Sequence, residues 1–182
     1  MVGGKWVQLL KEVVPNLTKA AVVFNPKTAP YTTLYLRAME AVAPSIGVNV
    51  FVEPIHDDAE IEAVFAKHRS AEGSGLIFMT DAFISVHRKR IIELAARFAV
   101  PALYPYRYYV ADGGLISHGA DQLEQCRGAA NYVDRILKGE KPGDLPVQGP
   151  DRYALIVNMK TAKALGLTVP ESLLAHADEG IE

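Results

Sequence analysis

The chain has 182 residues, of which 49% are hydrophobic and 22% charged, and its formal net charge is −2. These values are typical of a globular protein with a sizeable core, and basic residues scattered among acids do not form the clustered basic face that nucleic-acid binding requires. The only cysteine, Cys126, excludes an intrachain disulfide and a cysteine metal cluster. No apolar run reaches the ~18 residues of a membrane span.

Apolar runs alternate with helical patterns along the first 121 residues. Strands are predicted at 20–26, 48–55, 75–80, 100–104 and 114–117, and helices at 6–14, 31–46, 57–69 and 85–99. The strands are nearly continuous apolar runs, as expected for a sheet that is covered on both sides. The fold class predicted is therefore α/β, with a doubly wound, mainly parallel sheet and helices on both faces, similar to flavodoxin.

The pattern changes after residue 121. A long helix over 122–138 ends at Gly139, and a Pro- and Gly-rich connector follows it. A late strand at 152–159, a short helix at 161–166 and a helical tail that starts near Pro170 complete the chain. We therefore divide the chain into an α/β ligand-binding lobe, residues 1–121, and a C-terminal return segment, residues 122–182, that packs on the lobe or on a partner.

Polar and aromatic residues gather where the predicted strands end. In open α/β sheets, ligands bind outside the carboxyl ends of the strands. Asp81 and Arg107 lie one to three residues beyond strand ends, where they could grip the ammonium and carboxylate groups of a zwitterion; the alternative is that both charges only rim the sheet. The full set of candidate ligand-binding residues is Asn25, Thr28, Asp81, Tyr104, Tyr106, Arg107, His118 and Asp121.

Sequence signatures of catalysis and of cofactor binding are missing. The chain has no G-x-G-x-x-G or P-loop phosphate motif and no G-x-S-x-G nucleophile elbow, and its five histidines are not paired at metal-ligand spacing. We therefore expect no cofactor, no metal and no catalytic residue, which favours binding over enzymatic activity. The alternatives are a small flavodoxin-like or Rossmann-like enzyme and a ligand-sensing signalling module.

Several ordered motifs resemble those of a known family. They are GKWVQLLKEVVPNLTKAAVVFNP (4–26), SHGAD (117–121), YVDRILKG (132–139), LPV (145–147) and NMKTAKALGLTVP (158–170). In this order they resemble the tryptophan/tyrosine-type substrate-binding proteins of ABC transporters, from about Lys5 to the end of the chain. His118 departs from the family pattern, which has a tyrosine there; if this position touches the ligand, specificity differs from that for aromatic amino acids, so the resemblance leaves the identity of the ligand open.

The resemblance implies a periplasmic-binding-protein type I fold, in which two α/β lobes close on a small ligand such as an amino acid. It implies a non-catalytic protein that works with ABC permease subunits in the periplasm or another extracytoplasmic space. This chain corresponds to the second lobe and the return segment, so the first lobe and the secretion signal are expected to be missing; a naturally truncated chain would be cytoplasmic. The apolar face of the helix at 122–138 would then be bare, and we expect a homodimer through it.

Overall fold

A seven-stranded sheet runs through the molecule in the computed structural model, which describes residues 2–69 and 71–182. Its order is β2-β1-β3-β4-β5-β6-β7, and every neighbouring pair is parallel except β5 and β6. The strands are β1 Lys19–Phe24, β2 Asn49–Pro54, β3 Ser74–Phe78, β4 Ala102–Tyr104, β5 Ile116–Ala120, β6 Tyr153–Asn158 and β7 Glu179–Ile181. The prediction of a mainly parallel α/β sheet is confirmed.

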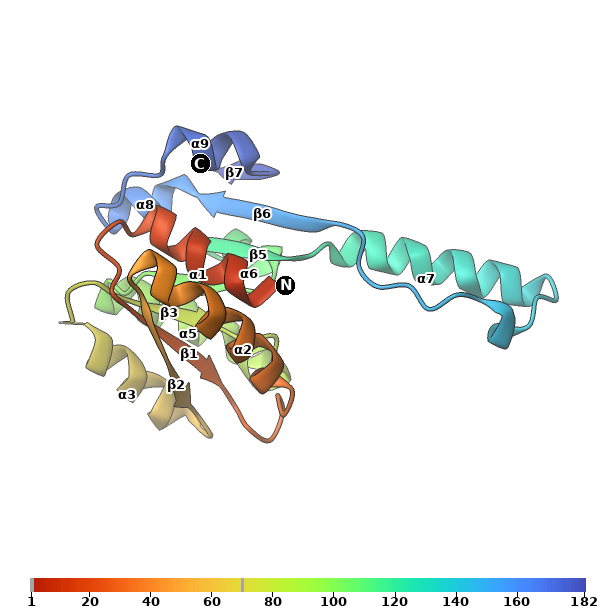
Figure 1. Cartoon of the computed structure of the whole chain (residues 1–182), viewed down its shortest axis with the longest axis horizontal. Helices are drawn as coiled ribbons and strands as arrows, with labels where there is room; N and C mark the ends of the chain where they lie inside the picture. Colours follow the sequence, from red (N-terminus) through yellow and green to blue (C-terminus); the bar gives the residue numbers. More distant parts are fainter. Residues whose placement is uncertain (1, 70) are drawn as a thin grey trace.

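Helices cover both faces of this sheet (Figure 1). One face carries α1 Val2–Val13, α2 Thr32–Val42 with the short η1 turn Ala43–Ile46, α8 Met159–Ala164 and α9 Glu171–His176. The other carries α3 Asp58–His68, α4 Ala82–Val86, α5 Arg88–Phe98 and α6 Arg107–Ala111. Two apolar layers result, because successive side chains of a strand point to opposite faces: Val22 of β1 joins the first layer and Val23 the second.

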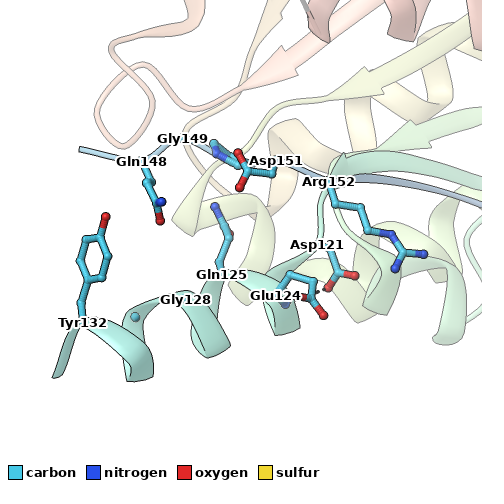
Figure 2. A pocket seen from close by; sticks show the side chains of 11 residues that line it. Asp121, Glu124, Gln125, Gly128, Tyr132, Gln148, Gly149, Asp151 and Arg152 are labelled. Atoms are coloured by element: carbon cyan, nitrogen blue, oxygen red, sulfur yellow. Dashed lines mark hydrogen bonds between the residues drawn. The ribbon is translucent and has the colours of Figure 1, made fainter. Parts of the chain in front are cut away.

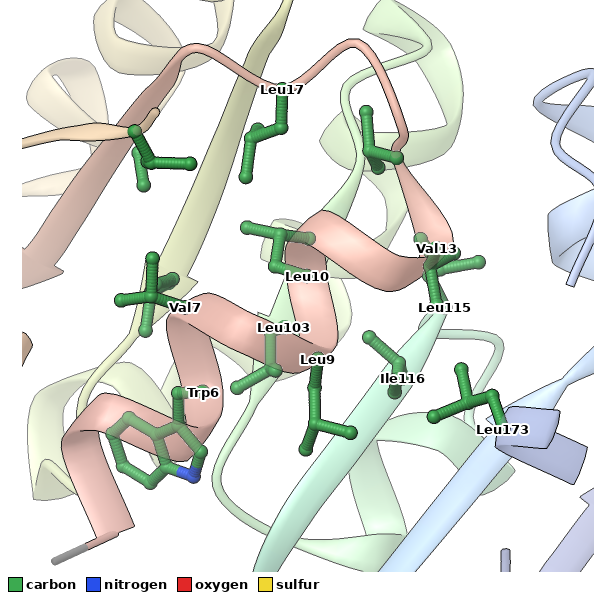
Figure 3. Packing of buried hydrophobic residues seen from close by; sticks show 14 of the residues in the cluster. Trp6, Val7, Leu9, Leu10, Val13, Leu17, Leu103, Leu115, Ile116 and Leu173 are labelled. Carbon is green, nitrogen blue, oxygen red and sulfur yellow. The ribbon is translucent and has the colours of Figure 1, made fainter. Parts of the chain in front are cut away.

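Helix α1 fills the middle of the first layer (Figure 3). The helix was predicted from residue 6, but it begins at Val2 and includes two glycines, which are poor helix formers. A Cβ on Gly3 would lie 2.7 Å from the Tyr35 carbonyl oxygen, and one on Gly4 would lie 3.0 Å from that of Ala38. The glycines therefore let α1 approach α2 closely, and packing outweighs their low helix propensity.

The C-terminal tail differs from its prediction. It was expected to be helical throughout, but it contains only the short helix α9 and ends in β7, which pairs with β6 in parallel. The helix predicted over 85–99 is also two helices, because Asp81 caps a separate short helix α4 and the chain turns at His87 before α5. Residues 153–182 thus complete the sheet that residues 19–120 begin.

Residues 121–152 project from the sheet as an arm (Figure 1). The arm contains α7 Gln122–Leu137, the turn η2 Pro142–Asp144 and the connector that returns to β6. It is held by the antiparallel pair β5 and β6, and none of the residues of α7 is buried. Over the described parts of the chain, no helix is long and apolar enough to cross a membrane.

Candidate functional site

The carboxyl ends of the parallel strands β1, β3 and β4 meet at one edge of the sheet, as their registers require. The segments that follow them carry Asn25, Asp81 and Tyr106. A hydrogen bond of 2.7 Å from the backbone N–H of Asn25 to the Asp81 carboxylate joins the first two segments directly. The sequence prediction that these strand ends lie together is therefore confirmed.

The Asp81 side chain joins the segments that follow β1 and β3. Its side chain is only 2% exposed and caps α4 by accepting a hydrogen bond of 2.8 Å from the N–H of Phe83. It also accepts a bond of 2.5 Å from the Thr28 hydroxyl, in addition to the Asn25 bond. Three donors thus satisfy a carboxylate that would be costly to bury alone. The geometry makes Asp81 a brace between the ends of β1 and β3.

Two tyrosines border the edge beside Thr80. The hydroxyl of Tyr31 donates to the Thr80 carbonyl, and its ring is 39% exposed. Tyr106 is half-buried and stacks on Tyr108, with ring centroids 5.4 Å apart. Burial raises the pKa of Tyr31, with a contribution from the Asp81 charge, and burial also raises the pKa of Tyr106. Both rings therefore present neutral phenols with an apolar body.

Tyr31 was not among the candidate residues. Its hydroxyl reaches Thr80 from 49 positions away, a contact that no local pattern reveals. The available signal was its position, three residues after Thr28 in the segment that follows the first predicted strand.

Tyr104 lies in the core. Its side chain has no exposed surface, and its ring stacks between Phe78, 5.4 Å away, and Tyr109, 5.1 Å away. Burial raises the pKa of the phenol. A ring enclosed on both faces cannot stack on a ligand, so Tyr104 supports the end of β4 from inside. This corrects the expectation that it lines the site, which rested only on its place at a strand end.

Arg107 faces the C-terminal strand. Its Nε donates to Glu179 Oε2 at 2.6 Å and its Nη2 to Oε1 at 2.5 Å, a bidentate pair across 72 residues. The bonds raise the pKa of Arg107 and lower that of Glu179. The guanidinium fork that the sequence suggested for a ligand carboxylate is therefore occupied by a carboxylate of the chain itself. Its partner is β7, the strand that the sequence did not predict.

His118 and Asp121 lie where the arm leaves the sheet. The His118 carbonyl accepts a hydrogen bond of 2.6 Å from Trp6, and its ring stacks on Tyr153 at 5.9 Å. Burial lowers the pKa of His118, and the charge of Lys5 lowers it further. Asp121 caps α7 by accepting from the N–H groups of residues 123 and 124. Both residues build the root of the arm rather than the edge around Asn25.

Two hollows adjoin the arm. One, of about 450 Å³, lies at its root and is lined by Arg107, Asp121 and Glu179 over an apolar floor that includes Leu123 and Ile156. The other, of about 670 Å³, lies between α7 and the connector, and Figure 2 shows Gln125 and Tyr132 pointing across it toward Gln148 and Gly149.

The candidate residues other than Tyr104 lie in two places. Those of the edge group are Asn25, Thr28, Asp81 and Tyr106, and those of the root group are Arg107, His118 and Asp121.

Within residues 2–69 and 71–182, no three metal-ligating side chains come together. The fold is that of open α/β proteins with a mainly parallel sheet, a class in which ligands commonly bind outside the carboxyl ends of the strands.

Comparison with known proteins identifies the family. A family model described as "ABC transporter substrate binding protein" matches residues 4–181, so the chain belongs to that family. Its members are substrate-binding proteins of ABC transporters rather than enzymes, in agreement with the sequence prediction. A tyrosine-binding protein of Clostridioides difficile is 22% identical over 163 residues, which are 90% of this chain and 47% of that protein.

Solved structures share the fold. A conserved domain protein from Vibrio cholerae O1 biovar eltor superposes with a TM-score of 0.83 and 26% identity, covering 98% of this chain and 60% of that one. An ABC domain from Streptococcus pneumonia, solved in complex with L-Trp, has a TM-score of 0.84 and 24% identity, covering 98% and 62%. The chain therefore spans about half to three fifths of the length of the relatives it matches.

Proposed function

We propose that this chain is the second lobe of a solute-binding component of an ABC importer. In this role it forms one wall of a cleft that closes on an amino acid or a similar small molecule. The observation that carries the proposal is the joining of the ends of β1 and β3 through Asp81, beside the rings of Tyr31 and Tyr106. Family membership supports the role in transport. In this proposal the partners are the permease subunits of the transporter, and the protein works outside the cytoplasm.

The chemistry of the edge favours a ligand with both a polar and a flat apolar part. Asn25 and Thr28 lie at this edge as polar residues, and Asp81, whose buried carboxylate is taken up by three donors of the chain, positions them rather than gripping a ligand ammonium group, while Tyr31 and Tyr106 offer ring surface for stacking. Relatives described as a tyrosine-binding protein and as an L-Trp complex are consistent with such a ligand. Arg107, His118 and Asp121 would contribute from the root of the arm, with Arg107 exchanging Glu179 for a ligand carboxylate.

An NMR titration of the 182-residue chain tests the proposal. L-tryptophan and L-tyrosine are expected to shift the backbone amide signals of residues 25–28, 80–83 and 105–107, whereas a sugar should not. The Tyr106→Ala variant should bind these amino acids about fivefold more weakly, because the stacking contact with the Tyr106 ring is lost. If no ligand in a panel of amino acids, purines and sugars perturbs these segments at millimolar concentration, the proposed site is wrong.

The role of Arg107 needs its own comparison. Arg107→Ala should lower amino-acid affinity about tenfold, since a charged hydrogen bond is lost. Arg90→Ala is the matched control, because it also removes an exposed arginine from a carboxylate partner, Glu62, in an ion pair between α5 and α3. Equal affinity in the two variants would show that Arg107 serves only the fold.

A further inference from the structure

Three carboxylates line the root hollow, the hollow of about 450 Å³ where the arm leaves the sheet, and the chain holds two of them firmly. Asp121 caps α7 by accepting from two of its backbone N–H groups. Asp178 accepts at 2.9 Å from the backbone N–H of Leu155 and at 2.9 Å from the Arg152 guanidinium. Because backbone groups depend on these bonds, both carboxylates are committed to the fold.

The third carboxylate, that of Glu179, is held less firmly. Among the residues that the structure describes, its oxygens are bonded to the Arg107 guanidinium alone. The side chains of this pair are 37% exposed for Glu179 and 56% for Arg107. Exposed ion pairs contribute little to stability and exchange partners readily. The pair can therefore open toward the hollow without leaving a charge buried and unpaired.

An amino acid needs a cation and an anion side by side, because its carboxylate and its ammonium group are attached to the same carbon atom. Asp81 does not supply the anion, since three donors of the chain occupy its buried carboxylate. Arg107 and Glu179 are two opposite charges in direct contact, and both are accessible from the hollow. They match the two charges of such a ligand in sign and in spacing.

We propose that Arg107 and Glu179 form a clamp for a zwitterion, in which one ion pair of the chain is replaced by two ion pairs with the ligand. The Arg107 guanidinium takes the ligand carboxylate, and the Glu179 carboxylate takes the ligand ammonium group. Glu179 is thus the residue that selects ligands with both charges. The clamp rests on the proposed function, because its ligand is the amino acid or similar molecule that the chain is proposed to bind.

The root hollow connects this clamp to the strand edge. Its volume lies within the range of small-molecule sites, and Tyr108 and Ile156 line it beside the ion pair. Tyr108 stacks on Tyr106 of the edge group, with ring centroids 5.4 Å apart. A ligand whose charged groups lie in the clamp can therefore place a flat side chain along these rings. All of these groups belong to this chain, so the clamp does not depend on what faces it from elsewhere.

The charge of Glu179 is expected to act in opposite directions on two kinds of ligand. A zwitterion gains a partner for its ammonium group, whereas a ligand with only a carboxylate competes with Glu179 for Arg107. Three probes that share the indole ring separate these effects: L-tryptophan carries both charges, 3-indolepropionate only the carboxylate and tryptamine only the ammonium group. The wild-type 182-residue chain should bind L-tryptophan about tenfold more tightly than either analogue, because each analogue lacks one charged contact.

Glu179→Gln should therefore weaken the binding of L-tryptophan about fivefold and strengthen that of 3-indolepropionate about threefold in NMR titrations. Glu62→Gln is the matched control, because it also neutralises a partly exposed carboxylate that is bonded to arginine, between α3 and α5, and it should change neither affinity. Equal affinity of the wild type for the three probes would overturn the proposal. A change of the same sign for L-tryptophan and 3-indolepropionate in Glu179→Gln would also overturn it.

The backbone amide signals separate failure of the clamp from failure of the proposed function. If L-tryptophan shifts the signals of residues 25–28, 80–83 and 105–107 but Glu179→Gln changes both affinities alike, the clamp is wrong and the proposed function stands. If none of the three probes shifts these segments at millimolar concentration, in the wild type or in the variant, both are wrong. The signals of residues 153–158 and 179–181 show whether the variant keeps β6 and β7 paired. Should that pairing be lost, the comparison of the three probes in the wild type decides.

Discussion

Gly119 of β5 lies so close to Pro105, the residue after β4, that a Cβ on the glycine would sit 1.8 Å from the proline carbonyl oxygen. This contact fixes the strand that leads to the arm against the segment that carries Tyr106. No side chain can be accommodated there unless backbone moves, so the glycine is required by close approach rather than by a special backbone angle.

Gly119→Ala is therefore expected to destabilise the chain by at least about 2 kcal/mol, which lowers the melting temperature by roughly 5 °C or more for a protein of this size. Gly128→Ala in α7 is the matched control: its Cβ would meet nothing within 4 Å, and alanine is the better helix former. That variant should melt at the same temperature or slightly higher. Similar melting temperatures for both variants would contradict the close contact.

The braced carboxylate makes a second prediction. Asp81→Ala removes one helix cap and leaves the buried N–H of Asn25 and the Thr28 hydroxyl without their acceptor, which should cost about 3 kcal/mol in the free energy of unfolding. Asp57→Ala removes the cap of α3 in an exposed setting and should cost only about 1 kcal/mol. Urea denaturation measures both values. Equal losses would mean that Asp81 acts as a cap alone.

Some features of this edge could be predicted from the sequence and others could not. Strand and helix alternation is local, so it predicted the sheet and placed Asn25 and Asp81 at the same edge. It could not predict that the Asp81 carboxylate points inward, because the groups that donate to it, the N–H of Asn25 and the hydroxyl of Thr28, come from a segment more than 50 residues away. Tyr104 looked equally suited to a ligand, but it is enclosed by Phe78 and Tyr109, and burial depends on the packed fold.

The short strand β7 was missed for a similar reason. Three residues with one glycine carry little strand signal, and what makes them a strand is pairing with β6 and the bond between Glu179 and Arg107. The family resemblance, by contrast, was found in the sequence, because ordered motifs survive at low overall identity. It predicted the fold and the class of protein but not the contacts of single side chains.

The pair of Arg107 and Glu179 should make a modest contribution to stability. Both side chains are more than a third exposed, so a double-mutant cycle with Arg107→Ala and Glu179→Ala is expected to give a coupling below about 1 kcal/mol. The pKa of Glu179 is lowered in the folded chain, so the coupling is present at neutral pH and is lost as the carboxylate is protonated, below the usual glutamate value of 4.5. Coupling that persists at pH 2 would contradict an ionic pair.

Acid sensitivity closer to neutral pH is expected from His68. The ring is buried, and its Nδ1 is hydrogen-bonded to the Ser74 hydroxyl at 2.6 Å. Burial is the main cause that lowers the pKa of His68, whereas the charge of Glu53 raises it. The unfolded chain therefore binds a proton more readily than the folded one, and stability should fall as pH drops below about 6.5. His68→Gln removes the titrating group, so the variant should lose less stability than the wild type between pH 7.5 and 5.5 in thermal melts. The pKa of His118 is lowered in the same sense, so some dependence should remain until that residue is also replaced. An unchanged slope in the double variant would assign the acid sensitivity to other groups.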